Sequence, residues 1–591
     1  MATRRSDPHP SLDGITTIAK YLLDRLAQVG VRHIFGVPGD YSLLFLDAID
    51  AHPDLEWVGT ANELNAAYAA DGYARMNGLA ALVTTYGVGE LSAINGVAGS
   101  YAEHVPVLHI VGMPATDVQR QGLHVHHGLL DGDSGHFVRA FDEVTCASAT
   151  LTADTADTAD TADTADTADT AAAEIDRVLR RVVSEKEPGY LGLPTDLVHA
   201  PCLAAEEEWV ADLATGALLG SEAEPALSGF VERAAELIDG ATRVVVLVDH
   251  LADRHHVRAE LDALIRAGHL ASATTKAARG TVDETTPGFL GVYVGAAGED
   301  GVRAAVEGAD VVIAVGLHLS DLSSGGFTAT LDPGRLLDLR PTHAVVGGVP
   351  CRGVTMAAAL SALTAVVAGR GPAADDAPAC SSRPARGAQA SVPADAELTQ
   401  AILWDRFADF LRPDDLLAAD QGTAFEGLLA VRLPRGADLI AQPLWASIGY
   451  TLPALLGAQL GASAHRRAVL LIGDGALQMT AQELGGIIAQ GLDPIVVVLN
   501  NDGYTVERVI HGRDAHYNGI ARWNWSACPS LFGASPDAVV RRVTTVGELD
   551  DALAACAEPA GNVSLVEVVL GQYDVPPALS RLVRTVAAAG E

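Results

Sequence analysis

One segment near the C-terminal end, AVLLIGDGALQMTAQELGGIIAQGLDPIVVVLNN, constrains the fold of this chain more than any other. Residues 468–472 are apolar and strand-like, and a tight Gly-Asp-Gly turn follows at 473–475. A helix-length stretch continues to about Gly491, and Pro494–Leu499 has the composition of a second buried strand. The segment therefore predicts a βαβ unit with parallel strands, in which the turn lies at the N-terminus of a helix.

The residues of this turn suit a diphosphate with a magnesium ion. Backbone N–H groups at a helix N-terminus attract an anion, and Gly473 and Gly475 let the backbone approach it closely. Asp474 supplies a carboxylate and Asn501 an amide oxygen, both at strand ends. With diphosphate oxygens, a backbone carbonyl and a water, they would complete the octahedral oxygen shell of Mg²⁺.

A Gly-Asp-Gly turn alone is common, but its continuation is specific. The turn at 473–475, the helix, Asn500-Asn501 and then GYTVE at 503–507 resemble the signature of thiamine-diphosphate enzymes. Within them, the chain resembles the 2-oxo acid decarboxylases that act on pyruvate, indolepyruvate and phenylpyruvate, and the broad-range alpha-keto-acid decarboxylases most closely. The resemblance extends from GVPGDYSLLFLDAI through ANELNAAYAADGYAR to VPPALSRL, and so covers nearly the whole chain.

The length of 591 residues predicts several domains, each with its own core. Strand-like runs alternate with helical stretches in three blocks, about 15–200, 224–369 and 398–575. Such alternation predicts an α/β fold of three doubly wound parallel-sheet domains, with helices on both faces of each sheet. The resemblance implies that they are the pyrimidine-binding, central and diphosphate-binding domains. Residues 371–394, rich in Pro, Ala, Ser and Gly, read as a linker.

Residues 152–169 are six tandem Thr-Ala-Asp triplets inside the first block. A period of three matches neither a helix face nor a strand face, and Asp at every third position cannot build a core. We therefore expect a solvated insertion without a catalytic role. Metal binding by its aspartates is the less favoured alternative.

Charge and composition exclude several classes of function. The net charge of −36 argues against nucleic acid or an anionic membrane as a partner. None of the three lysines follows a glycine, which excludes the phosphate loop of nucleotide hydrolases. The six cysteines lack metal-ligand spacing and are expected to be reduced. No apolar run is long enough to cross a bilayer, and residues 1–14 lack a signal-peptide core, so we expect a cytoplasmic protein.

The resemblance implies that thiamine diphosphate and Mg²⁺ lie between two α/β domains of different subunits. The protein would then be at least a homodimer, and the family is commonly tetrameric. Glu63 would activate the pyrimidine ring, which needs a carboxylic group beside a ring nitrogen in a dry pocket. Ile448 would hold the cofactor in its bent form, and the Ala446 carbonyl would accept from its amino group. The cofactor-binding residues implied are Glu63, Thr423, Ala446, Ile448, Gly473, Asp474, Gly475, Ala476, Asn501, Gly503 and Tyr504, with Asp474, Asn501 and Gly503 as magnesium ligands.

Two adjacent histidines, His126 and His127 in GLHVHHGLLDGD, mark the subclass most sharply. Side chains at i and i+1 diverge on a regular element, which disfavours a shared metal ion. In the resembling family, paired histidines instead act with two acids, here Asp40 and Glu507, as proton donors near the substrate. Histidine suits this role because it titrates near neutrality.

The substrate pocket is implied less completely. Phe425, Val506 and Ile510 occupy positions of pocket walls, whereas Glu426 departs from the apolar or aromatic residue usual there. A buried carboxylate is costly unless it is paired or protonated, so Glu426 is expected to point away.

The activity expected is the non-oxidative decarboxylation of an aromatic or branched-chain 2-oxo acid to an aldehyde and CO₂. The alternatives are a pyruvate-specialised decarboxylase, an acetolactate-synthase-like carboligase, and a non-catalytic family member kept as a binding or regulatory subunit. The histidine pair and Glu507 argue against the carboligase. The middle block lacks Gly-x-Gly-x-x-Gly after a strand, which weakly disfavours FAD.

Overall fold

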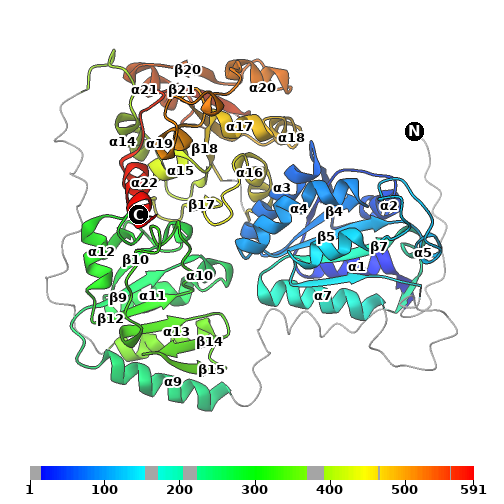
Figure 1. Cartoon of the computed structure of the whole chain (residues 1–591), viewed down its shortest axis with the longest axis horizontal. Helices are drawn as coiled ribbons and strands as arrows, with labels where there is room; N and C mark the ends of the chain where they lie inside the picture. The colour runs from blue at the N-terminus through cyan, green and yellow to red at the C-terminus, as the bar shows by residue number, and fades with distance from the viewer. Residues whose placement is uncertain are drawn as a thin grey trace. The chain divides into compact units, whose positions relative to one another are not determined.

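The alternating strand and helix patterns form parallel sheets in the computed structural model of this chain (Figure 1). The structure describes residues 15–153, 171–203, 223–368, 392–463, 466–558 and 561–590. Within these ranges lie three large sheets of six, seven and six strands and one sheet of two strands. The first large sheet belongs to a compact unit, Met1–Ala217, and the other two to a second unit, Leu218–Glu591. The predicted α/β class with three sheet domains is confirmed.

The sheet of the first unit is entirely parallel. Its strands, in spatial order, are β3 (Glu56–Gly59), β2 (His33–Gly36), β4 (Ala80–Thr85), β5 (Val107–Met113), β7 (Gly189–Pro194) and β6 (Ala147–Thr150). Its helices are α1 (Ile18–Gln28), α2 (Leu43–Ala51), α3 (Glu63–Asn77), α4 (Val88–Ala102), α5 (Thr116–Arg120), α6 (His136–Asp142) and α7 (Ala171–Glu185). The central strands β4, β5 and β7 are buried along their whole length, as expected for a sheet covered on both faces.

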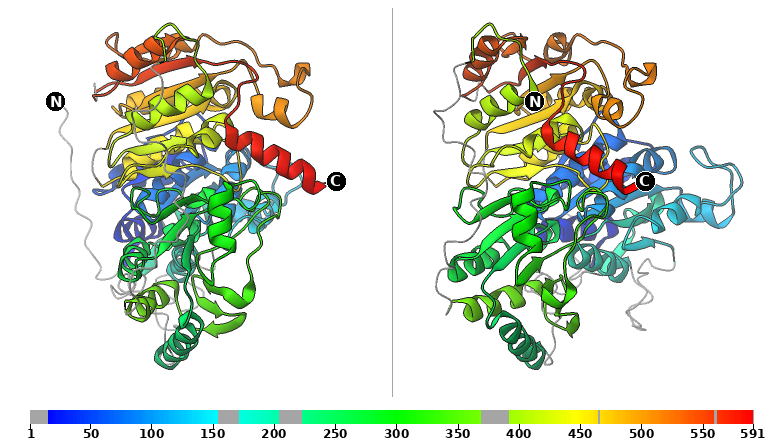
Figure 2. Two further views of the ribbon diagram at one scale, coloured as in Figure 1. Left: turned by 90° about the vertical axis from the view of Figure 1, so that its left-hand side faces the viewer. Right: turned by 60° about the vertical axis from the view of Figure 1, so that its left-hand side comes forward.

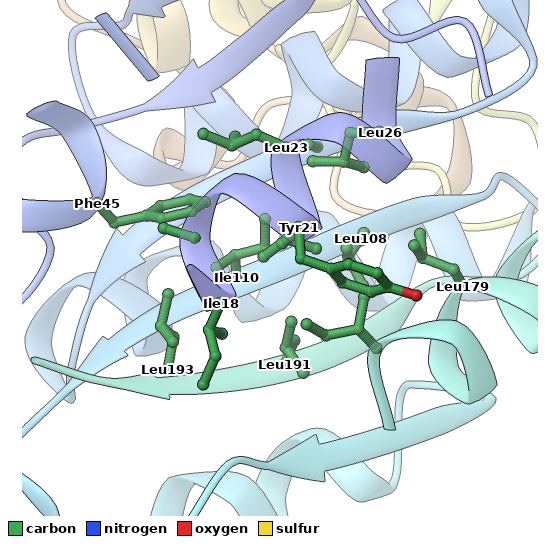
Figure 3. Packing of buried hydrophobic residues seen from close by; sticks show 14 of the residues in the cluster. Ile18, Tyr21, Leu23, Leu26, Phe45, Leu108, Ile110, Leu179, Leu191 and Leu193 are labelled. Atoms are coloured by element: carbon green, nitrogen blue, oxygen red, sulfur yellow. The ribbon is translucent and has the colours of Figure 1, made fainter. Parts of the chain in front are cut away.

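Helix α1 shows how one face of this sheet is covered (Figure 3). Its apolar side chains, among them Ile18 and Leu26, belong to one buried cluster with Leu108 of β5 and Leu191 of β7. The spacing of these apolar positions places them on one side of the helix. A short antiparallel pair, β1 (Ile15–Thr17) with β8 (Pro201–Leu203), joins the two ends of the described unit.

The second sheet is parallel in its first part only. Its order is β11 (Phe289–Val292), β10 (Ala271–Thr274), β9 (Val244–Val248), β12 (Val311–Val315), β13 (Leu336–Leu339), β14 (His343–Val346) and β15 (Val349–Arg352). The predicted parallel sheet has an antiparallel edge in addition, formed by β13, β14 and β15. Only short turns connect these strands, and a parallel return needs a crossover of a dozen or more residues. The helices are α9 (Ala223–Ile238), α10 (His250–Arg254), α11 (Arg258–Gly268), α12 (Asp300–Glu307) and α13 (Met356–Val367).

The third sheet is again parallel. Its order is β17 (Asp438–Ile440), β16 (Leu416–Ala419), β18 (Ala468–Gly473), β19 (Ile495–Asn500), β21 (Ser564–Val569) and β20 (Val540–Val543). Its helices are α14 (Gln400–Phe410), α15 (Thr423–Leu428), α16 (Thr451–Gly461), α17 (Asp474–Thr480), α18 (Glu483–Ala489), α19 (Thr505–Ile510), α20 (Cys528–Leu531), α21 (Val546–Ala555) and α22 (Pro577–Gly590).

The βαβ unit predicted from the sequence is present as β18, α17, α18 and β19. Two helices, and not the single helix expected, lie between the strands. The first ends at Thr480, whose hydroxyl donates to the Gly449 carbonyl at 2.7 Å. The second contains the adjacent glycines 485 and 486, which lower helix propensity.

Several sequence expectations fall wholly or partly outside the described residues. Positions 154–169 of the Thr-Ala-Asp repeat and 371–391 of the predicted linker are among them. Among the described cysteines, none forms a disulfide bond with another. Among the described helices, none combines the length and apolar character that a bilayer crossing requires.

A buried ion pair joins the second and third sheets. Lys276, just after β10, donates its Nζ to Glu426 Oε1 of α15 at 2.6 Å, and both side chains are buried. Glu426 is therefore paired, which explains how the chain tolerates a carboxylate where an apolar residue is usual. Nearby, Arg279 pairs with Glu284 and also donates to the Leu428 carbonyl at 3.0 Å. Charged side chains thus fix the contact between these two sheets.

Replacing Lys276 with Met should lower the free energy of unfolding by about 3 kcal/mol, because Glu426 would be left buried without a counter-charge. The double variant Lys276→Met/Glu426→Leu should recover most of this loss. The comparison is made by denaturant unfolding of the second unit within the full chain. Arg266→Met is the matched control, since Arg266 forms an exposed pair with Asp262 in the same unit and should change stability little. Equal effects of Lys276→Met and Arg266→Met would contradict the prediction.

Candidate active site

The predicted diphosphate turn lies at the carboxyl edge of the third sheet. Strands β18 and β19 are parallel neighbours, with Gly473 beside Leu499, so Asp474 and Asn501 follow the ends of adjacent strands. Both side chains are buried, with 2% of Asp474 and 4% of Asn501 exposed. The carboxyl edge is where parallel α/β sheets bind ligands.

The Asp474 carboxylate connects the two strand ends. Its Oδ1 accepts from the Gly475 N–H at 2.8 Å, and its Oδ2 accepts from the Gly503 N–H at 3.1 Å. Burial raises the pKa of Asp474 to about 6 despite these hydrogen bonds. The two hydrogen bonds therefore hold the carboxylate in one orientation. They do not fully replace the hydration that the carboxylate loses on burial.

Asn501 has a buried side-chain oxygen, Oδ1, with no hydrogen-bond partner in the described structure. Buried polar atoms are nearly always satisfied, so an orphaned oxygen beside a buried carboxylate calls for a cation. Gly503 has φ of +127°, a conformation that favours glycine, and a side chain there would collide with the Asn518 carbonyl. The oxygen donors of Asp474 and Asn501 thus fit Mg²⁺, whose ligands are hard oxygens.

The backbone around the turn leaves room for a diphosphate. A Cβ on Gly473 would meet open space, with no atom within 4 Å. A Cβ on Gly475 would lie 2.6 Å from the Tyr504 ring, so glycine lets Tyr504 pack over the turn. Ala476, the next residue, is buried in α17.

The segment predicted to hold the pyrimidine is fixed by a residue that the sequence reasoning missed. Asp420, directly after β16, is fully buried and accepts from the Gly449 N–H at 3.1 Å and the Thr451 hydroxyl at 2.6 Å. Burial raises the pKa of Asp420 to about 6. Its place directly after a buried strand was the available signal, the same one that identified Asp474.

Within this segment, Ala446 adopts φ of +61°, which is uncommon for a residue other than glycine. Ile448 is half-buried and is not among the buried core residues. Thr423 begins α15 and is buried beside Gly422, whose φ is +121°. The unusual backbone at Ala446 and Gly422 brings these predicted cofactor contacts to the carboxyl edge of the sheet.

Three predicted catalytic side chains meet in the first unit. Asp40 Oδ2 lies 2.6 Å from His126 Nε2, and Asp40 Oδ1 lies 3.6 Å from His127 Nε2. The two imidazole centroids are 4.4 Å apart. The expected divergence of adjacent side chains does not apply, because the pair lies in a turn where His127 has φ of +65°. Tyr41, which the sequence reasoning overlooked, stacks on His126 with ring centroids 5.1 Å apart.

Glu63 lies near the same turn of the chain. It is the first residue of α3, directly after the capping residue Asn62, whose side chain accepts from the Asn65 N–H at 2.8 Å. A Cβ on Gly89 would lie 3.3 Å from Glu63 Oε1, and a Cβ on Gly87 would overlap the His127 carbonyl. The start of α4 therefore contacts the Glu63 carboxylate at Gly89 and the histidine turn at Gly87. Glycine is needed for the close approach at Gly87.

The remaining candidates lie on α15 and α19 of the second unit. Glu507 is exposed on α19, as is Ile510, whose side chain is 57% exposed, while Val506 is half-buried. Phe425 is 1% exposed and belongs to the apolar core of the third sheet. Its role as a pocket wall stays a prediction. Asp40, Glu63 and the histidine pair thus belong to one compact unit, and the magnesium candidates and Glu507 to the other.

The affinity for Mg²⁺ should fall about tenfold for each pH unit below about 6, because a proton competes for the Asp474 carboxylate. Titration with Mg²⁺ in the presence of thiamine diphosphate, between pH 5 and 8, measures this. Asp474→Asn should bind the metal weakly at every pH. Asp420→Asn is the control, because Asp420 also titrates near pH 6 but contacts the 449–451 backbone. The fall of Mg²⁺ affinity with decreasing pH should therefore be unchanged in this variant. A constant affinity across this range would contradict the assignment.

Comparison with known proteins agrees with this geometry. Models of the thiamine pyrophosphate enzymes match their N-terminal TPP binding domain at residues 16–134, their central domain at 231–362 and their C-terminal TPP binding domain at 425–568. These three matches fall on the three large sheets.

Curated relatives match along nearly the whole chain. An alpha-keto-acid decarboxylase of Mycolicibacterium paratuberculosis is 48% identical over 568 residues, which is 96% of each chain. Those of Mycobacterium leprae and Mycobacterium tuberculosis are each 46% identical, covering 97% of this chain and 96% and 98% of their own. These matches show that the chain belongs to the thiamine-diphosphate-dependent 2-oxo acid decarboxylase family.

Proposed function

We propose that this protein decarboxylates an aromatic or branched-chain 2-oxo acid, such as phenylpyruvate, indolepyruvate or 2-oxoisocaproate, to the aldehyde and CO₂. The observation that carries the proposal is the contact of Asp40 with His126 and His127, because it brings a carboxylate and two imidazoles, all of which can donate and accept protons, together. The names of the mycobacterial relatives, alpha-keto-acid decarboxylase, support the same reaction class.

Thiamine diphosphate, when bound, supplies the electron sink that lets CO₂ leave. Asp474 and Asn501 would hold its magnesium ion, together with the Gly503 carbonyl. Gly473, Gly475 and Ala476 would present backbone to the diphosphate, with Tyr504 packed on the turn. Thr423, Ala446 and Ile448 would contact the rest of the cofactor, and Glu63 would hold a proton at its ring nitrogen.

The chain's own acids and histidines manage the protons of the reaction. His126 Nε2 and the Asp40 carboxylate share a hydrogen bond at 2.6 Å, so one proton can move between them. His127 extends the pair, and Glu507 contributes a carboxyl group from α19.

The size of substrate that the pocket accepts depends on the side chains of α19. Val506 and Ile510 lie one turn apart on this helix, and neither is large and aromatic. A Cβ on Gly422 would lie 3.7 Å from Val506, so this side chain borders the segment that precedes Thr423. Aliphatic walls of this size favour large 2-oxo acids over pyruvate.

Aldehyde release should be measured with purified protein, thiamine diphosphate and Mg²⁺ on pyruvate, 2-oxoisovalerate, 2-oxoisocaproate, phenylpyruvate and indolepyruvate. We expect higher kcat/KM for the large acids than for pyruvate. Val506→Phe should lower kcat/KM for the aromatic acids by about tenfold or more relative to pyruvate, since it narrows the pocket.

Other results of this assay would select an alternative. Turnover of pyruvate alone would place the protein with the pyruvate-specialised decarboxylases. Hydroxyketone in place of aldehyde would indicate an acetolactate-synthase-like carboligase. No product with the cofactor bound would leave a binding or regulatory role.

Gly87→Ala should reduce kcat by about a hundredfold or more, because the new methyl group would displace the His127 carbonyl. The matched control is Gly30→Ala. Gly30 also has positive φ, +95°, but a Cβ there meets no atom within 4 Å. Both variants should lose about 1 kcal/mol of stability from backbone strain, Gly87→Ala should lose more because of the overlap with His127, and only Gly87→Ala should lose activity. Equal kcat in the two variants would refute the placement of His127 in the catalytic turn.

We still predict that the protein assembles at least into a homodimer, and the family resemblance implies a homotetramer. Exposed apolar side chains on α2 and α4, including Leu43, Leu44, Val88 and Leu91, support a subunit contact on this unit. A monomer mass by light scattering at micromolar concentration would refute it. The cytoplasmic location stays a prediction as well.

A further inference from the structure

An open groove of about 510 Å³ lies between the C-terminal helix α22 and the second sheet's loops. Figure 2 shows α22, in red, against the green segments of the same unit. The groove is lined by Ala296, Thr328, Arg581, Arg584, Thr585 and Ala588. None of these residues belongs to the site described above.

One wall of the groove is a rigid pair of loops. Residues 291–298 and 320–328 are packed so closely that a Cβ on Gly295 would overlap the Ser324 carbonyl, and one on Gly325 would overlap the Val294 carbonyl. Thr328 Oγ1 accepts from the Ala296 N–H at 2.8 Å and so ties the two loops together. This wall is therefore formed before any ligand arrives.

The other wall is one face of α22. Arg581, Arg584, Thr585 and Ala588 follow the i, i+3, i+4, i+7 spacing that places side chains on one side of a helix. Leu582 packs against Val294 and Ala297 in a small apolar cluster and seats the helix on the first wall. The two arginines consequently project into the groove from a fixed base.

The charge of these arginines is not compensated by the protein. Among the described residues, no carboxylate pairs with Arg581 or Arg584, although acidic residues outnumber basic ones by 75 to 39 in this chain. Arg581 Nε is buried and has no hydrogen-bond acceptor. A buried guanidinium N–H without an acceptor is costly, and no hydrogen bond from the terminal nitrogens of Arg581 or Arg584 is found within the described ranges, so these terminal N–H groups can donate to an acidic ligand in the groove.

We propose that this groove binds a small oxyanion, a carboxylate or a phosphate, through Arg581 and Arg584. The planar guanidinium fork matches both groups by paired N–H···O bonds. Thr585 lies on the same helix face and also lines the groove. The proposal does not rest on the decarboxylase reaction, because its residues and its readout are separate from that site.

A ligand in the groove would act on α22, which also packs against α15 and α19. These helices carry Glu426 and Glu507, respectively. By joining α22 to the loops of the second sheet, a bound oxyanion would hold the helix that neighbours the predicted catalytic α19. Binding should therefore raise the melting temperature of the protein as well as give a heat signal.

The test is isothermal titration calorimetry on the full chain saturated with thiamine diphosphate and Mg²⁺, which keeps added phosphate out of the turn at 473–475. The two probes are inorganic phosphate and 4-methylpentanoate, a carboxylate that cannot be decarboxylated in this way because it lacks a keto group. We expect at least one probe to bind, and Arg581→Gln/Arg584→Gln to weaken that binding tenfold or more. Arg233→Gln, at an exposed arginine of α9, is the matched control and should bind as the parent does.

The two probes identify the source of the ligand. If the double variant loses binding of phosphate only, the groove is assigned to a phosphorylated ligand. If it loses binding of the carboxylate only, the groove is assigned to an organic acid. A loss of both supports a general oxyanion site. The exposed Arg584→Gln single variant, which should weaken binding at least threefold, replaces the double variant if that fails to fold. No binding of either probe, or equal binding by the parent and the variants, would overturn the proposal.

Discussion

The third sheet is organised around the buried carboxylate of Asp474. It accepts from the N–H groups of Gly475 and Gly503 and so connects the ends of β18 and β19. One strand away, the buried carboxylate of Asp420 holds the 449–451 backbone in the same manner. Backbone N–H groups that a parallel sheet leaves unpaired at its carboxyl edge are thus satisfied by side chains from the strand ends themselves. The turn, the magnesium candidates and the pyrimidine segment all take their positions from these two residues.

Burying these acids has an electrostatic cost that a cation can recover. The pKa of Asp474 is raised to about 6, and Asn501 Oδ1 beside it lacks a donor. Both features are unfavourable in the protein alone, and both are relieved by one divalent ion with oxygen ligands. The same logic operates elsewhere in the second unit with opposite sign, where Arg581 presents a buried donor without an acceptor.

Contacts far apart in the sequence account for what the sequence reasoning did not foresee. Glu426 departs from the usual pattern, and its partner Lys276 lies 150 residues earlier, which no local pattern reveals. The histidine pair was expected to diverge, yet both rings reach Asp40 because a left-handed residue turns the chain there. Asp420 could have been found from its position after a strand, since Asp474 was found that way. Its contacts, however, run to a segment about 30 residues later.

The sequence by itself determined the parallel α/β class, the strand-turn-helix unit around Asp474, and the family to which the chain belongs. The fold class and this unit follow from local periodicity, from glycine at turns and from residues at strand ends, all of which are short-range properties. The family follows from the resemblance of motifs along nearly the whole chain. Only the tertiary structure decided the antiparallel edge at β13–β15, the Lys276–Glu426 pair and the groove beneath α22. Burial, charge pairing and orphaned polar atoms depend on which distant segments come together, and that is set by packing of the whole chain.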